Sequence, residues 1–361
     1  MPEAVIVATA RTPIGRAFKG SLIDLRPDDL TALVVREVLA QLPGLDPASV
    51  EDVLVGTASP AGEGGYNLAR VVALLAGLPG VPGVTVNRYC SSSLQTIRMA
   101  AHAVKAGEGD VFVAAGVDCV SRYLTGAADG MPDTHNPAFA DAEARSAARA
   151  LGGQDPWTPA TGLPDIYIAM GQTAENVRER CGVSRREMDE FAALSQQRAV
   201  AAQEDGYFDR EIVPVERPDG TVVTRDDGPR PGTTVERLAE LKPVFRPDGE
   251  VTAGNSCPLN DGAAAVVVMS DTRAASLGIT PLARIVSSGV TALDPEIMGL
   301  GPVEACRQAL GRAGMGIGDV DLVEINEAFA AQTIPSAAQL GIGWDKLNVR
   351  GGAIALGHPF G

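Results

Sequence analysis

The stretch VTVNRYCSSSLQTIRMAAHAVK, residues 84–105, decides the fold that we predict for this chain. Its β-branched start predicts the end of a buried strand, and the apolar residues after it recur at helical spacing. These apolar residues are Leu94, Ile97, Ala101 and Val104. Cys90 stands between strand and helix, Ser91–Ser93 are candidates for the helix N-cap, and Gly107 is placed to end the helix.

A thiol at the start of a helix is a candidate nucleophile. The helix dipole favours a thiolate by about 0.3–1 kcal/mol, which lowers the thiol pKa only modestly from its ordinary value of about 8.5. A nucleophilic role for Cys90 therefore needs a base from elsewhere, and the chain has three histidines to offer. This stretch alone is equally compatible with a small, buried core cysteine.

Length and composition indicate a globular protein of two or three domains. The chain has 361 residues, of which 45% are hydrophobic and 21% charged. Aromatic residues make up 4%, which leaves a core of Ala, Val, Leu and Ile that is typical of α/β proteins. The net charge of −15 argues against nucleic acid or a membrane as a partner, although a local basic pocket could hold an anionic cofactor.

The cysteines and the N-terminus favour the cytoplasm. Five cysteines without a CxxC pair predict neither a disulfide framework nor a zinc site. The N-terminal residues run directly into a strand pattern and show no secretory signal. The longest apolar run, Ala263 to Met269, is far too short to span a membrane.

The order of elements predicts a layered α/β fold. The expected strands are Ala4–Thr9, 51–56, Asp110–Val117, Ala263–Met269 and Ala283–Val290, and the expected helices are Leu30–Leu42, Asn67–Ala76, Met170–Cys181, Ser184–Asp205 and Thr272–Leu277. From about Ser121 the chain is rich in glycine, proline and charge, as in GAADGMPDTHNP at 126–137. This segment predicts a loop-rich subdomain inserted between regular elements.

An internal echo predicts two similar halves. Residues 29–56 and 302–326 share the plan of a helix, a short acidic connection and an apolar strand, and residues 84–90 correspond to 347–359. The alternative is that any two βα units look alike. If the halves are related by a pseudo-twofold axis, His358 lies opposite Cys90 and is the candidate base. His102 on the following helix and His135 in a polar loop are weaker candidates.

Six motifs in order over nearly the whole chain resemble the thiolase family of acetyl-CoA C-acyltransferases. The motifs are NRYCSSS around Cys90, AGEGGYNLAR at 61–70, GQTAEN at 171–176, TAGNSCPLNDGAAAV at 252–266, EINEAFAAQ at 324–332 and GGAIALGHPFG at 351–361. The resemblance implies two βαβαβαββ halves in five α-β-α-β-α layers with an inserted loop domain. It assigns residues 1–120 and 258–281 to the first half, 121–257 to the loop domain and 282–361 to an incomplete second half, and it implies a homodimer or homotetramer.

The resemblance also assigns roles to side chains. Cys90 would take the acyl group as a thioester, His358 would remove its proton, and Asn326 would hold a water with His358 in an oxyanion site. Coenzyme A, as a substrate and not a permanently bound cofactor, would contact Arg230 through its nucleotide and Met170, Cys257 and Phe329 through its pantetheine. Arg230 could equally be a solvated loop cation, and no metal or nicotinamide is required.

Three departures from the family pattern narrow the activities that the resemblance implies. The family's second cysteine, in a C-x-G motif beyond the GHP turn, is missing before Gly361, so we expect a truncated chain. Ala169 replaces the histidine of acetoacetyl-CoA enzymes, which argues against a strictly acetoacetyl-CoA-specific acetyltransferase. Cys257 and Pro258 replace a common serine and glycine at a pantetheine contact.

The function we predict is that of a thiolase that cleaves 3-ketoacyl-CoA with coenzyme A, or runs in reverse as a Claisen condensation, in fatty acid metabolism. An acetoacetyl-CoA-specific enzyme is one alternative. A second is a β-ketoacyl synthase-like enzyme, against which NEAF argues because a second histidine is expected there. A third is a non-catalytic protein that binds acyl-CoA or lipid.

Overall fold

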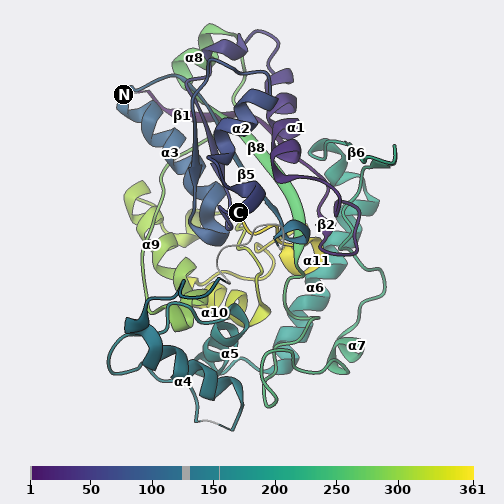
Figure 1. Ribbon diagram of the computed structural model, residues 1–361, viewed down its shortest axis with the longest axis vertical. Helices are drawn as coiled ribbons and strands as arrows, with labels where there is room; N and C mark the ends of the chain where they lie inside the picture. The colour runs from purple at the N-terminus through teal and green to yellow at the C-terminus, as the bar shows by residue number, and fades with distance from the viewer. Residues whose placement is uncertain (1, 124–130, 154) are drawn as a thin grey trace.

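The computed structural model describes residues 2–123, 131–153 and 155–361 (Figure 1). Residues 124–130 and 154 of the predicted loop segment lie outside the described residues. A mixed sheet of seven strands has the order β4-β3-β5-β8-β1-β9, with β2 paired to β8, and β6 pairs with β7 apart from it. The strands are β1 Ala4–Arg11, β2 Gly15–Arg16, β3 Asp52–Gly56, β4 Gly83–Val86, β5 Val111–Cys119, β6 Val215–Glu216, β7 Val222–Val223, β8 Asn260–Ser270 and β9 Ala283–Arg284.

The helices are α1 Pro27–Ala40, α2 Leu68–Leu75, α3 Ser92–Ala106, α4 Ala140–Ala150, α5 Met170–Cys181, α6 Arg185–Glu204, α7 Val235–Ala239, α8 Asp271–Ser276, α9 Gly301–Ala313, α10 Ala330–Leu340 and α11 Ala353–Leu356. Two parallel βαβ units follow one another in the predicted order. Strand β3 pairs in parallel with both β4 and β5, through helices α2 and α3. The carboxyl ends of β3 and β5 therefore meet at one edge of the sheet, where α3 begins.

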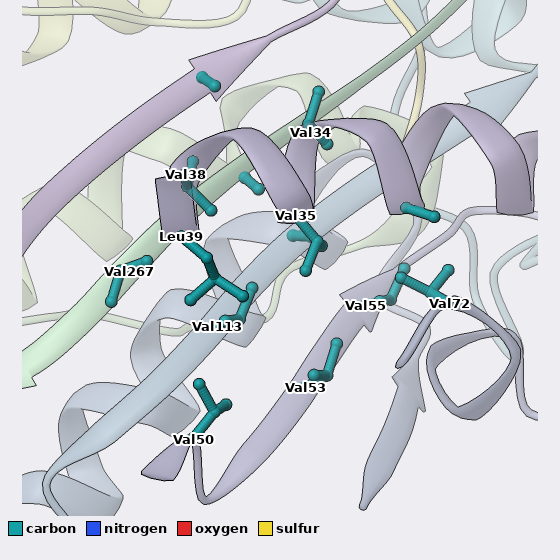
Figure 2. Packing of buried hydrophobic residues seen from close by; sticks show 14 of the residues in the cluster. Val34, Val35, Val38, Leu39, Val50, Val53, Val55, Val72, Val113 and Val267 are labelled. Carbon is teal, nitrogen blue, oxygen red and sulfur yellow. The ribbon is translucent and has the colours of Figure 1, made fainter. Parts of the chain in front are cut away.

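The two faces of the sheet bury different helices. On one face, α1 and α2 cover the odd-numbered residues of β3 and β5, such as Val53 and Val113. Figure 2 shows this packing, with Val35 of α1 over the strands. On the other face, α3 covers Leu54 and Ala114, because successive strand residues point to opposite faces. The sheet is thus a middle layer between helices, and the predicted α/β class is confirmed.

Helices of the inserted segment pack against the C-terminal part of the chain. The members of this second core include Met188, Phe191, Ile325, Ala331 and Leu347. In Figure 1, α5 and α10 lie together below the sheet. The predicted bounds of Met170–Cys181 agree with those of α5. Helix α6 begins with a capping box between Ser184 and Glu187, and this feature explains why its start was readable from the sequence.

The C-terminal part forms less regular strand structure than we predicted. The expected strand Ala283–Val290 is reduced to β9, Ala283–Arg284, which pairs with β1. Val323 and Leu347 make a single parallel bridge, at the positions that the internal echo matches to β3 and β4. In the first half β3 is flanked by strands on both sides, whereas the described residues around Val323 pair on one side only. With a partner on one side only, the backbone around Val323 forms a single bridge and not a regular strand.

Edge position also changes the environment of β4. We predicted a buried strand at Val84–Val86, but all of its residues are only half-buried because β4 is an outer strand of the sheet. Leu94 of α3, predicted to be on the apolar face, is 67% exposed. Over the described parts of the chain, no helix combines the length and the apolar character needed to cross a membrane.

Candidate active site

The Cys90 turn is held by hydrogen bonds from its own residues. Cys90 lies in a short 3-10 turn, Tyr89–Ser91, directly before α3. The Ser92 hydroxyl accepts from the backbone N–H of Arg88 at 2.8 Å and donates to the carbonyl of Tyr89 at 2.7 Å. Tyr89 has a positive φ of 45°, which is strained for a residue with a side chain. The Ser92 hydroxyl therefore holds the backbone on both sides of the turn that carries Cys90.

The start of α3 is capped differently from our prediction. Ser91 occupies the N-cap position, but its side chain makes no capping hydrogen bond. Instead the backbone N–H of Ser93 donates to the carbonyl of Gly361 at 2.9 Å. The acceptor for this N–H at the helix start thus comes from the chain segment that carries His358. Gly361 lies 268 positions after Ser93 in the sequence.

Two paired glycines allow this close approach. Gly56 and Gly116 are register partners on β3 and β5. A Cβ on Gly56 would lie 2.6 Å from backbone atoms of Ser92 and Ser93, and one on Gly116 would lie 2.7 Å from the carbonyl oxygen of Gly361. Only glycine at both positions lets the helix start rest on the edge of the sheet.

The surroundings of Cys90 oppose its ionisation. Desolvation and the nearby carboxylate of Asp118 raise the pKa of the thiol to about 11, although the residue is exposed. The prediction of a modestly lowered pKa is therefore wrong for this state, because those two effects outweigh a helix dipole of about 1 kcal/mol. At neutral pH the resting group is a thiol.

His358 is buried and neutral. Its backbone N–H donates to Asn260 Oδ1 at 2.9 Å, and its Nε2 lies 3.1 Å from Asn326 Nδ2. Burial lowers the pKa of His358 to about 4. Since an amide nitrogen can only donate, Nε2 acts as the acceptor and the ring proton sits on Nδ1. At neutral pH the Nε2 lone pair of His358 is therefore unprotonated and accepts from Asn326.

A buried carboxylate that we did not single out supports this arrangement. Glu327 follows Asn326 and is 1% exposed. It accepts from the Ser195 hydroxyl at 2.6 Å, from Asn348 Nδ2 at 2.8 Å and from the backbone N–H of Ile354 at 3.1 Å. Through these hydrogen bonds Glu327 connects helix α6, the segment after Leu347 and helix α11. Its position next to a motif asparagine was the available signal.

Cys257 lies in the segment between the other motifs. Its backbone N–H donates to the carbonyl of Ala328 at 2.9 Å, and Leu259 forms a bridge with His358. Burial, together with the charge that Cys90 carries once it is ionised, raises the pKa of Cys257 to about 12, so the two sulfur atoms lie within electrostatic range of each other. Through these contacts the structure joins Cys90, Cys257, Asn326 and His358 in one region at the sheet edge.

The remaining predicted contacts surround this region. Met170 begins α5 and is 43% exposed, and the next residue, Gly171, lies directly against the ring of Phe245. Phe245 in turn packs edge-on against Phe329, with ring centroids 5.8 Å apart. These residues form a partly apolar wall beside Cys257, because Ser256 and Phe329 are bridge partners.

Arg230 lies on the rim. It is exposed, and its backbone N–H donates to Gln196 Oε1 at 2.8 Å. Desolvation lowers the pKa of Arg16, and the nearby charge of Arg230 lowers it as well. Two residues earlier, Gly228 packs against the carbonyls of Ala355 and Leu356 in the segment that leads to His358. The Arg230 loop therefore borders the site.

The other histidines lie elsewhere. His102 is exposed on α3. His135 is exposed, approaches Glu143 at 2.8 Å and stacks on Tyr167, with ring centroids 3.9 Å apart. Neither shares a described contact with Cys90.

Comparisons with known proteins agree with this architecture. The thiolase N-terminal domain model matches residues 4–272, and the thiolase C-terminal domain model matches residues 279–361. A 3-ketoacyl-CoA thiolase of Bacillus subtilis is 44% identical over 374 residues, covering 100% of this chain and 90% of that protein. An acetyl-CoA acetyltransferase of Pseudomonas aeruginosa is 44% identical over 373 residues, with the same coverage.

Solved structures show the same similarity. The dimeric peroxisomal thiolase of Saccharomyces cerevisiae superposes with a TM-score of 0.88 at 36% identity, covering 99% of this chain and 87% of that chain. The acetyl-CoA acetyltransferase of Bacillus anthracis gives a TM-score of 0.84 at 38% identity, covering 99% and 88%. Fold and matches together define an enzyme that transfers acyl groups. The chain belongs to the thiolase family, and the predicted fold is confirmed.

Proposed function

We propose that this protein is a 3-ketoacyl-CoA thiolase that works through a thioester on Cys90. The observation that carries the proposal is the hydrogen bond between Ser93 and Gly361, which joins the helix start beside Cys90 to the segment of His358. Asn326 Nδ2, which lies 3.1 Å from His358 Nε2, adds an amide donor beside the imidazole. Nucleophile, base and amide donor are the parts that acyl transfer to a thiol requires.

The pKa values of Cys90 and His358 favour transfer of the proton while the sulfur attacks the substrate, and not before the attack. Moving the proton from a thiol with a pKa of about 11 to an imidazole with a pKa of about 4 costs on the order of 10 kcal/mol before any attraction between the ions. That cost would consume much of a typical catalytic barrier. His358 Nε2 takes the proton as the Cys90 sulfur attacks the substrate carbonyl, and Asn326 releases Nε2 to do so.

Asn326 has a second task in this proposal. As the imidazole accepts the proton, the lone pair that Asn326 contacts is lost and the amide becomes free to donate elsewhere. The oxygen of a tetrahedral intermediate or enolate is then the nearest developing charge, directly or through a water. Fixed donors of this kind contribute several kcal/mol to acyl transfer.

Substrate binding in this proposal uses the rim and the apolar wall. Arg230, exposed and beside Arg16, offers positive charge to the phosphates of coenzyme A on a chain whose net charge is −15. Met170, Cys257 and Phe329 contact the pantetheine. Coenzyme A acts as a substrate here and is released after each turnover.

A second copy of the chain is proposed to complete the assembly as a homodimer. Strand β4 is an unpaired edge of the sheet, and large exposed side chains surround it. Tyr66 is 96% exposed, Tyr89 67% and Leu94 67%. An uncovered strand edge bordered by apolar groups favours association with another surface. The solved yeast relative is described as dimeric.

A panel of substrates tests the proposed activity. We expect coenzyme A-dependent cleavage of 3-ketoacyl-CoA thioesters of several chain lengths, since Ala169 stands where a histidine is expected in acetoacetyl-CoA enzymes. Cleavage of acetoacetyl-CoA alone would favour the specific acetyltransferase instead. Loss of carbon dioxide from malonyl thioesters would favour a synthase-like enzyme.

A further inference from the structure

Asp118 is a buried carboxylate to which the proposed chemistry gives no role. It lies near the end of β5 and is 1% exposed. Four groups donate to it. Oδ1 accepts from Thr57 Oγ1 at 3.0 Å and Tyr123 Oη at 2.7 Å, while Oδ2 accepts from the backbone N–H groups of Ala58, at 2.9 Å, and Gly361. Burial raises the pKa of Asp118, whereas these four donors favour its carboxylate form.

These donors come from segments that must meet at the site. Thr57 and Ala58 follow β3, and Gly361 lies three residues beyond His358. Both backbone polar groups of Gly361 are thus held, since its N–H donates to Asp118 and its carbonyl accepts from Ser93. Asn260 holds the backbone N–H of His358 from the other side. The imidazole is therefore positioned between two anchored points.

We propose that Asp118 is a positioning residue for the acyl transfer proposed above. Its carboxylate ties Gly361 of the His358 segment to the residues that follow β3 and β5, and this holds the Gly361 carbonyl against Ser93 of α3. Its buried negative charge also keeps Cys90 in the thiol form until the base takes the proton. The inference rests on the proposed function for its catalytic part. Desolvation raises the pKa of Cys90, and among the described titratable groups Asp118 on β5 raises it further. An ionised Cys90 in turn adds to the burial that raises the pKa values of Tyr123 after β5 and Cys257 in the neighbouring segment.

The hydrogen-bond pattern allows the clamp and the charge to be tested separately. In Asp118→Asn the amide oxygen can accept from the two backbone N–H groups, while the amide nitrogen donates to the Thr57 and Tyr123 hydroxyls, which can reverse their roles. This variant keeps the clamp and removes the charge. Asp118→Ala removes both. Asp110→Asn is the matched control, because Asp110 bonds Ser270 at the opposite end of β5.

The first measurement is the rate of Cys90 alkylation by iodoacetamide as a function of pH, without substrate. In Asp118→Asn we expect the rise in rate to move about one unit to lower pH, and in Asp110→Asn no movement. An unmoved profile in Asp118→Asn would overturn the electrostatic role. Because no substrate is present, this result is independent of whether the enzyme is a thiolase.

The second measurement is steady-state kinetics on a 3-ketoacyl-CoA. In Asp118→Ala we expect kcat to fall about 100-fold with little change in KM, since the reacting groups shift relative to one another while the coenzyme A contacts remain. In Asp118→Asn we expect kcat to stay within about tenfold. A folded Asp118→Ala with wild-type kcat would overturn the clamp. Should that variant not fold, Asp118→Ser replaces it, and the alkylation profile of Asp118→Asn still decides the role of the charge. A wild-type enzyme without thiolase turnover would refute only the proposed function.

Discussion

The backbone N–H of Ser93 donates to the carbonyl of Gly361 at 2.9 Å. Each of these residues stands three positions after a proposed reacting group, Cys90 in one case and His358 in the other. One main-chain hydrogen bond therefore ties the two ends of the site together, although 268 positions separate its partners. That hydrogen bond can form because Gly56 and Gly116, at the sheet edge, have no side chains that would keep the two segments apart.

Gly116→Ala should loosen this link. The new Cβ would lie 2.5 Å from the Ser93 side chain and 2.7 Å from the Gly361 carbonyl, so α3 or the His358 segment must shift. We expect a loss of about 1–3 kcal/mol in the free energy of unfolding. Denaturant unfolding measures it. Gly311→Ala, in an open position inside α9, is the control and should gain about 0.4–1 kcal/mol. Equal effects in both variants would contradict the packing described for Gly116.

Alkylation of the wild-type enzyme reports the ionisation of Cys90. With a thiol pKa of about 11, the rate should rise roughly tenfold per pH unit from about pH 7 to 10 without levelling off. Cys90→Ser corrects for the other four free cysteines. A plateau below about pH 8.5, the ordinary thiol pKa, would show that the site favours the thiolate.

The stability of the fold should depend on His358 at acid pH. Its pKa is lowered to about 4 in the folded chain, against an ordinary value of 6.5, so the unfolded chain binds more protons between these values. Stability from this group is present above about pH 6.5 and is lost as the pH falls towards about 4, by about 3 kcal/mol in all. His358→Gln should abolish that component in pH-dependent denaturant unfolding. The exposed His102→Gln is the control, and identical pH dependence in the two variants would be the contrary outcome.

Association through the β4 edge can be tested at one exposed leucine. Leu94→Asp places a charge among the apolar groups beside β4, and desolvating that charge in an interface is costly. Light scattering after size exclusion should give half the wild-type mass. Leu151→Asp, at a position that is 79% exposed on the inserted segment, should leave the mass unchanged. A dimeric Leu94→Asp would place the interface on another surface.

Much of the fold was predictable because its signals are local. Helix periodicity, caps and apolar strand runs depend on neighbouring residues, and they located α3, α5, α6 and β5. The hypothesis that His358 pairs with Cys90 came from the internal echo and the family motifs, and the resemblance to the family pointed to Asn326. The structure adds the direct contact between Asn326 and His358.

What escaped prediction depends on distant contacts. The sequence places Cys90 at a helix start, but the burial and the Asp118 charge that raise its pKa come from segments far along the chain. Asp118 looks like any polar residue after a strand until Gly361 and Tyr123 are seen to donate to it. For Glu327 the position next to Asn326 was the one signal in the sequence, and its role stayed hidden because its partners lie on three different segments. The shortened β9 likewise reflects strand neighbours and not composition.

Acylation of Cys90 by radiolabelled acetyl-CoA, followed by peptide mapping, tests the central claim most directly. We predict label on the Cys90 peptide of the wild-type enzyme, none in Cys90→Ser, and at least about 100-fold slower labelling in His358→Gln at the same thermal stability near neutral pH. Label on another residue, or wild-type labelling in a folded His358→Gln, would contradict the account.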